Sequence, residues 1–182
     1  MEGPGRVLGS GTVLATRRRG RLCLDLALGA AGFLLVQLFL VQVAVVRGHS
    51  MEPAIQDGDR LLVDRVSPVL DAVHRGSVVV LRCPLATHVD FVKRVVGVPG
   101  DRIAMERGQL LVNGRPFDLE HDVVIEDASS FRPVQVPDGH YFVLGDNRPD
   151  SCDSREFGLV AAELVKGTVR ARFWPLACSR LF

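Results

Sequence analysis

The sequence lacks the short motifs by which metal, redox and nucleotide enzymes are commonly recognised. It has four cysteines, but none forms a C-x-x-C pair: Cys23, Cys83, Cys152 and Cys178. A G-x-x-x-x-G-K-[ST] loop, an H-E-x-x-H stretch and an S-x-x-K stretch are absent as well. We therefore expect neither a metal ion nor a cofactor. Internal repeats and low-complexity tracts are also missing, and 182 residues predict one folded domain with a sizeable core.

A strong excess of positive charge is missing too. The chain carries 22 basic and 21 acidic residues, a formal net charge of +1 at pH 7. Five arginines precede residue 22, and the remainder of the chain is slightly acidic. A weakly acidic body argues against nucleic acid as a partner, because phosphate binding depends on clustered Lys and Arg side chains. The N-terminal arginines relate instead to the apolar stretch that follows them.

The longest apolar run, Leu26–Val46, contains only Gln37 and Gln42 as strongly polar residues. As a helix it would rise about 32 Å at ~1.5 Å per residue, enough to cross the hydrocarbon core of a bilayer. A cleavable signal peptide is the alternative interpretation. Its apolar region would span only roughly 7–15 residues, and the small-x-small site that should follow it is missing. The run therefore favours a permanent membrane anchor.

These observations predict three segments: a basic, disordered cytoplasmic tail over 1–21, a transmembrane anchor over 22–46, and a folded domain over 47–182. The arginines flank the N-terminal side of the anchor, and only Arg47 stands close to its other side. The positive-inside rule then keeps the N-terminus cytoplasmic and sends the domain across the membrane. Ser50 would lie within roughly 15 Å of the bilayer surface, because an extended chain covers at most ~3.6 Å per residue.

Beyond residue 47, runs of β-branched and aliphatic residues alternate with turn signals such as Pro99-Gly100 and Asn113-Gly114. This pattern predicts β-strands. The expected strands are Arg60–Asp64, Ser77–Leu81, Phe91–Val96, Arg102–Met105, Gln109–Val112, His140–Leu144 and Thr168–Phe173. Asp118–Arg132 is expected to be a surface loop, and Leu159–Lys166 the one helical element. The predicted fold class is mainly β: a single N-terminal transmembrane helix followed by an antiparallel β domain.

Ser50 is a candidate nucleophile that needs a base. None of the five histidines stands in a recognisable triad setting, and Gly48-x-Ser50-x-Glu52 departs from the G-x-S-x-G elbow at its last position. Lys93 is the other candidate, because it lies between valines on an expected apolar strand. Burial disfavours the charged form of a lysine and lowers its pKa, which makes the free amine available as a base. A serine with a desolvated lysine is one way to build an acyl-transfer site.

Three ordered stretches give this pair a wider context. They are Ser50-Met51-x-Pro53, Lys93-Arg94-Val95-Val96-Gly97-x-Pro99-Gly100-Asp101 and Gly145-Asp146-Asn147-Arg148-x-x-Ser151-x-Asp153-Ser154-Arg155. Together with the apolar run they resemble the sequence boxes of the type I signal peptidases, peptidase family S26. The third box and the stretch Leu111–Gly114 look more like the bacterial enzymes than like their near relatives, the mitochondrial inner-membrane peptidases.

The resemblance implies a Ser–Lys dyad with Ser50 as nucleophile and Lys93 as general base. It also implies that the Ser151 hydroxyl hydrogen-bonds the catalytic lysine, and that Asp153 and Arg155 form an ion pair supporting that loop. The Ser50 backbone N–H is the expected oxyanion donor. Some family members add a hydroxyl two residues before the nucleophile, where this chain has Gly48, so the second donor is left open.

The remaining box residues are interpreted as structural. Pro53 would stiffen the turn after the nucleophile. Asp146 and Asn147 are expected to organise their own turn through side-chain to backbone hydrogen bonds. The full set of expected turn residues is Pro53, Gly97, Pro99, Gly100, Asp101, Gly145, Asp146, Asn147 and Arg148.

By resemblance, the expected function is the removal of N-terminal signal peptides from exported preproteins, with cleavage after small residues. The expected partners are preproteins and the lipid bilayer, without nucleic acid, and the expected location is the plasma membrane with the domain on its outer face. The mitochondrial inner membrane is the alternative location. Two other functions stay open: a self-cleaving Ser–Lys regulator, which would need a DNA-binding segment, and a non-catalytic membrane-tethered β module. The sequence leaves the oligomeric state undetermined.

Overall fold

The computed structural model describes residues 25–33, 40–66, 68, 73–86, 88–117 and 129–182. The chain divides into two compact units, Met1–Phe39 and Leu40–Phe182. In the first unit, residues 25–33 are helical. Within the described ranges, no helix is both long and apolar enough to cross a membrane. The expected anchor over 22–46 therefore lies partly outside the described residues, and the tail over 1–21 lies wholly outside them.

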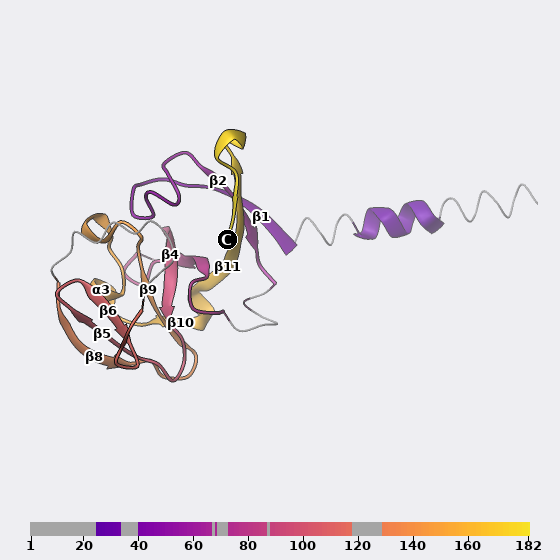
Figure 1. Ribbon diagram of the computed structural model, residues 1–182. Helices are drawn as coiled ribbons and strands as arrows, with labels where there is room; N and C mark the ends of the chain where they lie inside the picture. Colours follow the sequence, from indigo (N-terminus) through magenta and orange to yellow (C-terminus); the bar gives the residue numbers. More distant parts are fainter. Residues whose placement is uncertain (1–24, 34–39, 67, 69–72, 87, 118–128) are drawn as a thin grey trace, which may run out of the picture. The chain divides into compact units, whose positions relative to one another are not determined.

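The second unit consists of two antiparallel sheets (Figure 1). The larger sheet has the order β1 (Val41–Val45), β2 (Arg60–Asp64), β11 (Val165–Trp174), β3 (Val78–Arg82), β4 (Asp90–Gly97), β9 (His140–Leu144) and β10 (Val160–Ala161), with β12 (Arg180–Leu181) beside β11. The smaller sheet has the order β7 (Arg115–Pro116), β6 (Gln109–Val112), β5 (Arg102–Glu106) and β8 (Phe131–Gln135). The helices whose bounds the structure gives in this unit are single turns: η1 (Arg148–Asp150), α3 (Ser154–Phe157), η2 (Ala162–Leu164) and η3 (Leu176–Cys178).

The central strand β3 shows why aliphatic runs become strands here. Its side chains alternate between two cores: Val78 and Val80 belong to one, and Val79 and Leu81 to another. Successive side chains of a strand point to opposite faces, so a continuous β-branched run suits a strand that is covered on both sides. A third core joins the end of β4 and β9 to the smaller sheet. The predicted mainly β fold is confirmed for this unit.

Some expectations about secondary structure are wrong where the structure describes the residues. Val41–Val45, placed in the anchor helix, forms β1 and pairs with β2 in the register Val43↔Leu62. The alternation of valines with Gln42 and Ala44 suits a strand as well as a helix, and the exposed edge of β2 offers hydrogen-bond partners that a helix would leave unused. The expected anchor boundary at residue 46 is therefore too late.

The second error concerns Leu159–Lys166, which was expected to be helical. The structure gives this segment to β10, the single turn η2 and the start of β11. Pairing with β9 and with β3 outweighs the weak helical preference of so short a segment. Strand β8 was also missed, because its first residues were assigned to a loop.

Register shifts curl the larger sheet. Strand β11 slips against β3 between Val165 and Gly167, and against β2 between Val169 and Ala171. Such bulges bend a strand and increase its twist. Strands β1 and β4 stand four places apart in the sheet, about 19 Å at ~4.8 Å per step if the sheet were flat. Residues of both strands nevertheless line one cleft, so the sheet curves round to bring them together.

The curve depends on a close approach at Gly167, which gives the first prediction. A Cβ added there would lie 2.5 Å from Val63 Cγ1 and 2.8 Å from the Asp64 carbonyl oxygen. We expect Gly167→Ala to lower the free energy of unfolding by about 1–3 kcal/mol, because a backbone atom must move. Chemical denaturation measures this change. The control is Lys166→Ala, which removes an exposed ion pair with Asp90 and should cost less than about 1 kcal/mol. Equal effects of the two substitutions would contradict the packing argument.

Candidate active site

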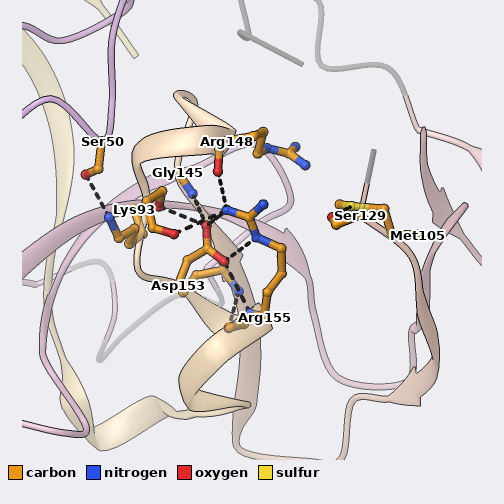
Figure 2. Close-up of polar contacts among 11 residues, drawn as sticks. Ser50, Lys93, Met105, Ser129, Gly145, Arg148, Asp153 and Arg155 are labelled. Atoms are coloured by element: carbon orange, nitrogen blue, oxygen red, sulfur yellow. Dashed lines mark hydrogen bonds and ion pairs between the residues drawn. The ribbon is translucent and has the colours of Figure 1, made fainter. Parts of the chain in front are cut away.

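Ser50 and Lys93 meet although 43 residues separate them. Ser50 lies in the turn that follows β1, and Lys93 lies in β4. Lys93 Nζ is 2.7 Å from Ser50 Oγ, and the two side chains point toward one another (Figure 2). Within the described part of the chain, Lys93 is the one side chain that hydrogen-bonds Ser50 Oγ. His49, the nearest histidine in sequence, is exposed and pairs with Glu52 at 2.9 Å instead.

The Lys93 amine is almost dry, since only 2% of the residue is exposed. Burial lowers the pKa of Lys93 below its usual value, because charging an amine away from water is costly. The negative charge of Asp153 opposes this effect without cancelling it. The Phe91 ring, whose centroid is 5.2 Å from Nζ, also favours the protonated amine and shields it from solvent. The net direction is toward a neutral amine that can accept a proton from Ser50.

The backbone around Ser50 is held at fixed points. Its carbonyl accepts a hydrogen bond from the Asn147 N–H at 3.0 Å. In the described structure its own N–H makes no hydrogen bond, so this donor is available to a ligand. The N–H of Gly48 is engaged, because it donates to Asp57 Oδ1 at 2.8 Å. Gly48 also has a φ of +104°, a conformation that favours glycine. Gly48 therefore supplies no second oxyanion donor in this arrangement.

Asp153 organises the loop next to Lys93 and is completely buried. It accepts hydrogen bonds from the Gly145 N–H at 3.0 Å and from the Ser151 hydroxyl at 2.8 Å. Arg155 Nε donates to it at 2.8 Å, which confirms the expected ion pair (Figure 2). The expected hydrogen bond from Ser151 to Lys93 is wrong: the hydroxyl donates to Asp153. A buried carboxylate is a stronger acceptor than an amine and needs its lone pairs satisfied.

A further ion pair, buried on both sides, does not follow from the sequence patterns. Arg94, next to Lys93 on β4, donates from Nε and Nη2 to the two carboxylate oxygens of Asp146 at 2.8 and 2.7 Å. Both residues are at least 95% buried. Asp146 was expected to bond the backbone of its own turn, and this expectation is wrong. The available signal was Arg94 itself, because an arginine inside an apolar strand requires a carboxylate partner.

The expected turn residues divide into two groups. Asp101 does organise a turn, since it accepts from the Val98 N–H at 3.0 Å and also pairs with Arg75 at 2.7 Å. Gly100 has a φ of +89°. Gly97, in contrast, ends β4, where a Cβ would meet Ile103 Cγ1 at 2.7 Å. Packing rather than turn geometry explains that glycine.

The remaining box residues lie in turns or short helices. Pro53 lies in the turn after Ser50, Pro99 lies beside Gly100, and Arg148 lies in η1.

A cleft of about 650 Å³ leads to the pair. Its walls come from β1 and from the first half of β4, and Ser50, Lys93, Asp150 and Cys152 lie at one end. Strands β1 and β4 run in the same direction, because three antiparallel neighbours separate them in the sheet. Gln42 and Asp90 therefore mark the opposite end of the cleft from the pair. Across the described residues, no group of His, Cys, Asp or Glu is placed to hold a metal ion.

The contact between Gly145 and the nucleophile's loop gives the second prediction. A Cβ on Gly145 would lie 2.5 Å from the Ser50 carbonyl oxygen and would overlap Ser151 Oγ. A Gly145→Ala chain must shift Ser50 by about 1 Å, and we expect kcat/KM to fall by about 10²-fold. Peptide-cleavage assays measure the loss, and thermal unfolding measures stability. Gly97→Ala is the matched control, because it overpacks the core away from Ser50. A parallel loss of activity in both variants would contradict this prediction.

Comparisons with known proteins agree with the sequence resemblance. The family described as "Signal peptidase, peptidase S26" matches residues 20–174. The chain is 37% identical over 146 residues to the "Probable signal peptidase I-2" of Synechocystis, covering 78% of this chain and 66% of that protein. It is 36% identical over 160 residues to "Signal peptidase IB" of Staphylococcus aureus, covering 79% of this chain and 83% of that protein.

A solved signal peptidase I from Enterococcus faecalis superposes with a TM-score of 0.47 and 29% identity, covering 54% of this chain and 97% of that one. The Synechocystis and Staphylococcus aureus relatives are bacterial, as the sequence resemblance predicted. The family match spans most of the chain and contains both Ser50 and Lys93. The chain belongs to the signal peptidase family, peptidase S26.

Proposed function

We propose that this chain removes signal peptides from exported preproteins, with Ser50 as the nucleophile and Lys93 as the general base. The observation that carries the proposal is the 2.7 Å separation between Ser50 Oγ and the buried Lys93 amine. A serine hydroxyl is a weak nucleophile unless a base removes its proton. A lysine can act as that base only when its pKa is depressed, and the burial of Lys93 acts in this direction.

The reaction follows from these positions. Lys93 Nζ accepts the Ser50 proton while Oγ attacks the scissile carbonyl, and the Ser50 N–H donates to the oxyanion. The resulting Lys93 ammonium gives its proton to the departing amine, which leaves an acyl-serine. Lys93 then accepts a proton from a water molecule that attacks the ester, and returns this proton to Ser50 Oγ when the acid leaves. The same amine thus serves as base and acid in both halves.

The cleft suits an extended peptide. In the described structure β1 pairs only with β2, and the first half of β4 pairs only with β3. Both strands therefore present backbone N–H and C=O groups toward the cleft, and a peptide can pair with them as an added strand. Its side chains meet an apolar wall near Ser50, which includes Val46 and Met51. Such a wall favours apolar side chains before the scissile bond.

We further propose that the apolar residues over 22–40 anchor the domain in a bilayer, with the arginine-rich N-terminus in the cytoplasm. One face of the larger sheet supports contact with lipid. Val43 and Val45 are 54% and 60% exposed, and Trp174 lies in the same row as Val45 because both strands pair with Arg60. Leu181 of β12 extends this face and is 82% exposed. An apolar patch of this kind marks an interaction surface.

The titration of Lys93 gives the third prediction. Activity requires the neutral amine, so kcat/KM should rise with pH through the lowered pKa of Lys93 and level off above it. Lys93→Ala should lower kcat by at least about 10²-fold while remaining folded. Lys93→Arg should be equally impaired, because a guanidinium keeps its proton.

Lys166→Ala, which changes the chain's other lysine, is the control and should retain the parental activity and pH profile. Cleavage of a labelled precursor in detergent, beside Ser50→Ala, measures these effects. Parental turnover by Lys93→Arg would exclude a lysine base. Full function of both Ser50→Ala and Lys93→Ala would instead support a non-catalytic membrane-tethered module.

The fourth prediction concerns topology. Protease added to intact spheroplasts should digest the domain from residue 47 onward, whereas a tag fused to the N-terminus should stay protected, because the arginines hold that end inside. Immunoblots with tags at both ends read the outcome, and detergent-lysed spheroplasts provide the control for tag cleavage. A protected domain with an exposed N-terminal tag would overturn the orientation.

A further inference from the structure

We propose that Asn147 is a positioning residue that aims the backbone N–H of Ser50 at the scissile carbonyl. This inference rests on the proposed role of Ser50 as nucleophile. Asn147 contacts the chain on both sides of Ser50. Its side-chain Nδ2 donates to the His49 carbonyl at 3.2 Å, and its backbone N–H donates to the Ser50 carbonyl at 3.0 Å. The two peptide groups that flank the nucleophile are therefore held by one residue.

Because the peptide group is planar, the hydrogen bond from Asn147 Nδ2 to the His49 carbonyl also sets the direction of the Ser50 N–H. The His49 carbonyl and the Ser50 N–H belong to the same planar trans peptide and point in opposite directions. A donor that fixes the direction of the carbonyl thus fixes the direction of the N–H. The Glu52 N–H also donates to the His49 carbonyl, at 3.1 Å, but it belongs to the same turn and moves with it. Asn147 is the contact that joins this peptide to the rest of the fold.

The anchoring of Asn147 explains why it can act as a reference point. It follows Asp146, whose carboxylate is held by Arg94 through two hydrogen bonds of 2.8 and 2.7 Å. Arg94 is in turn the neighbour of Lys93 on β4. Lys93, the proposed base, and Asn147, which bonds the backbone around Ser50, are therefore each adjacent in sequence to a member of the Arg94–Asp146 ion pair. Ser50, by comparison, lies in a turn outside the sheets and two residues after Gly48, whose φ is positive.

The expected consequence is specific to the transition state. Negative charge on the substrate oxygen develops only as Ser50 attacks, so an aimed N–H stabilises the tetrahedral species more than the bound peptide. Removing an oxyanion donor outright lowers kcat by about 10²–10³-fold. Without the Asn147 side-chain hydrogen bond, the Ser50 N–H is still present but its direction is no longer fixed. We expect kcat to fall by about 10-fold or more with KM little changed.

The test uses Asn147→Ala and Asn147→Asp in the full chain. Both variants keep the backbone N–H that bonds Ser50, and both remove the Nδ2 donor. Two peptide inhibitors of the same sequence separate aiming from general structure. A peptide aldehyde accepts Ser50 Oγ at its carbon, and the hemiacetal oxygen occupies the oxyanion position. A peptide with a CH2–NH group in place of the scissile amide has no such oxygen.

We expect the inhibition constant of the aldehyde to rise in proportion to the fall in kcat, while that of the CH2–NH peptide stays within about twofold. The pH profile of Asn147→Ala should keep its midpoint, because this substitution adds no charge near Lys93. Equal weakening of both inhibitors, a shifted midpoint in Asn147→Ala, or an unchanged kcat would each overturn the proposal.

The matched control is Asn113→Ala, which changes the chain's other asparagine. Its side chain accepts from the Arg102 N–H and donates to Asp101, at a turn of the smaller sheet. We expect it to lower stability without changing kcat. The Ser50→Ala variant separates this inference from the proposed function. If Ser50→Ala still cleaved the substrate, the proposed role of Ser50 as nucleophile would be refuted. If Ser50→Ala were inactive and both Asn147 variants fully active, only the positioning role of Asn147 would be refuted.

Discussion

The burial of one amine is the constraint on which the rest of the site depends. Lys93 is 98% buried, and burial makes the protonated form of its amine less stable than it would be in water. Its pKa is therefore lowered. The nearby Asp153 could restore the charge, but its oxygens already accept hydrogen bonds from Ser151, Gly145 and Arg155. Lys93 is left with Ser50 as its hydrogen-bond partner among the described residues. The Ser151 hydroxyl, which was expected to bond Lys93, donates to the Asp153 carboxylate instead.

Two guanidinium groups near the site follow a different rule from the lysine. The buried Arg94 and the partly buried Arg155 cannot lose their protons, and each contacts a carboxylate that balances its charge. These pairs join segments that are distant in sequence: Arg94 connects β4 to the residues after β9, and Arg155 closes the loop round Asp153. The two ion pairs fix the positions of the segments around the site. The proposed proton transfer falls to Lys93, because its amine can become neutral. Residues that touch no substrate thereby determine where Ser50 and Lys93 stand.

Some features could be predicted from the sequence and others could not. The β-branched runs between turn signals located β2, β6 and β9 with their observed bounds, because local pattern and tertiary pairing agree there. The run that ends at Val46 was misjudged at its C-terminal end, since hydropathy does not distinguish a membrane helix from an edge strand made of valines. Leu159–Lys166 was misjudged because its partners, β9 and β3, lie far away in sequence.

The same division holds for the candidate site. The sequence by itself determined which groups are present: a serine after the apolar run, a lysine within an aliphatic strand, and an Asp-x-Arg loop, because residue type and local pattern carry that chemistry. Only the tertiary structure decided which groups meet. The curl of the sheet, the Arg94–Asp146 pair and the contacts of Asn147 arise from residues that are dozens of positions apart. Whether a hydroxyl faces a lysine or an aspartate depends on distances of a few ångströms, which only packing sets.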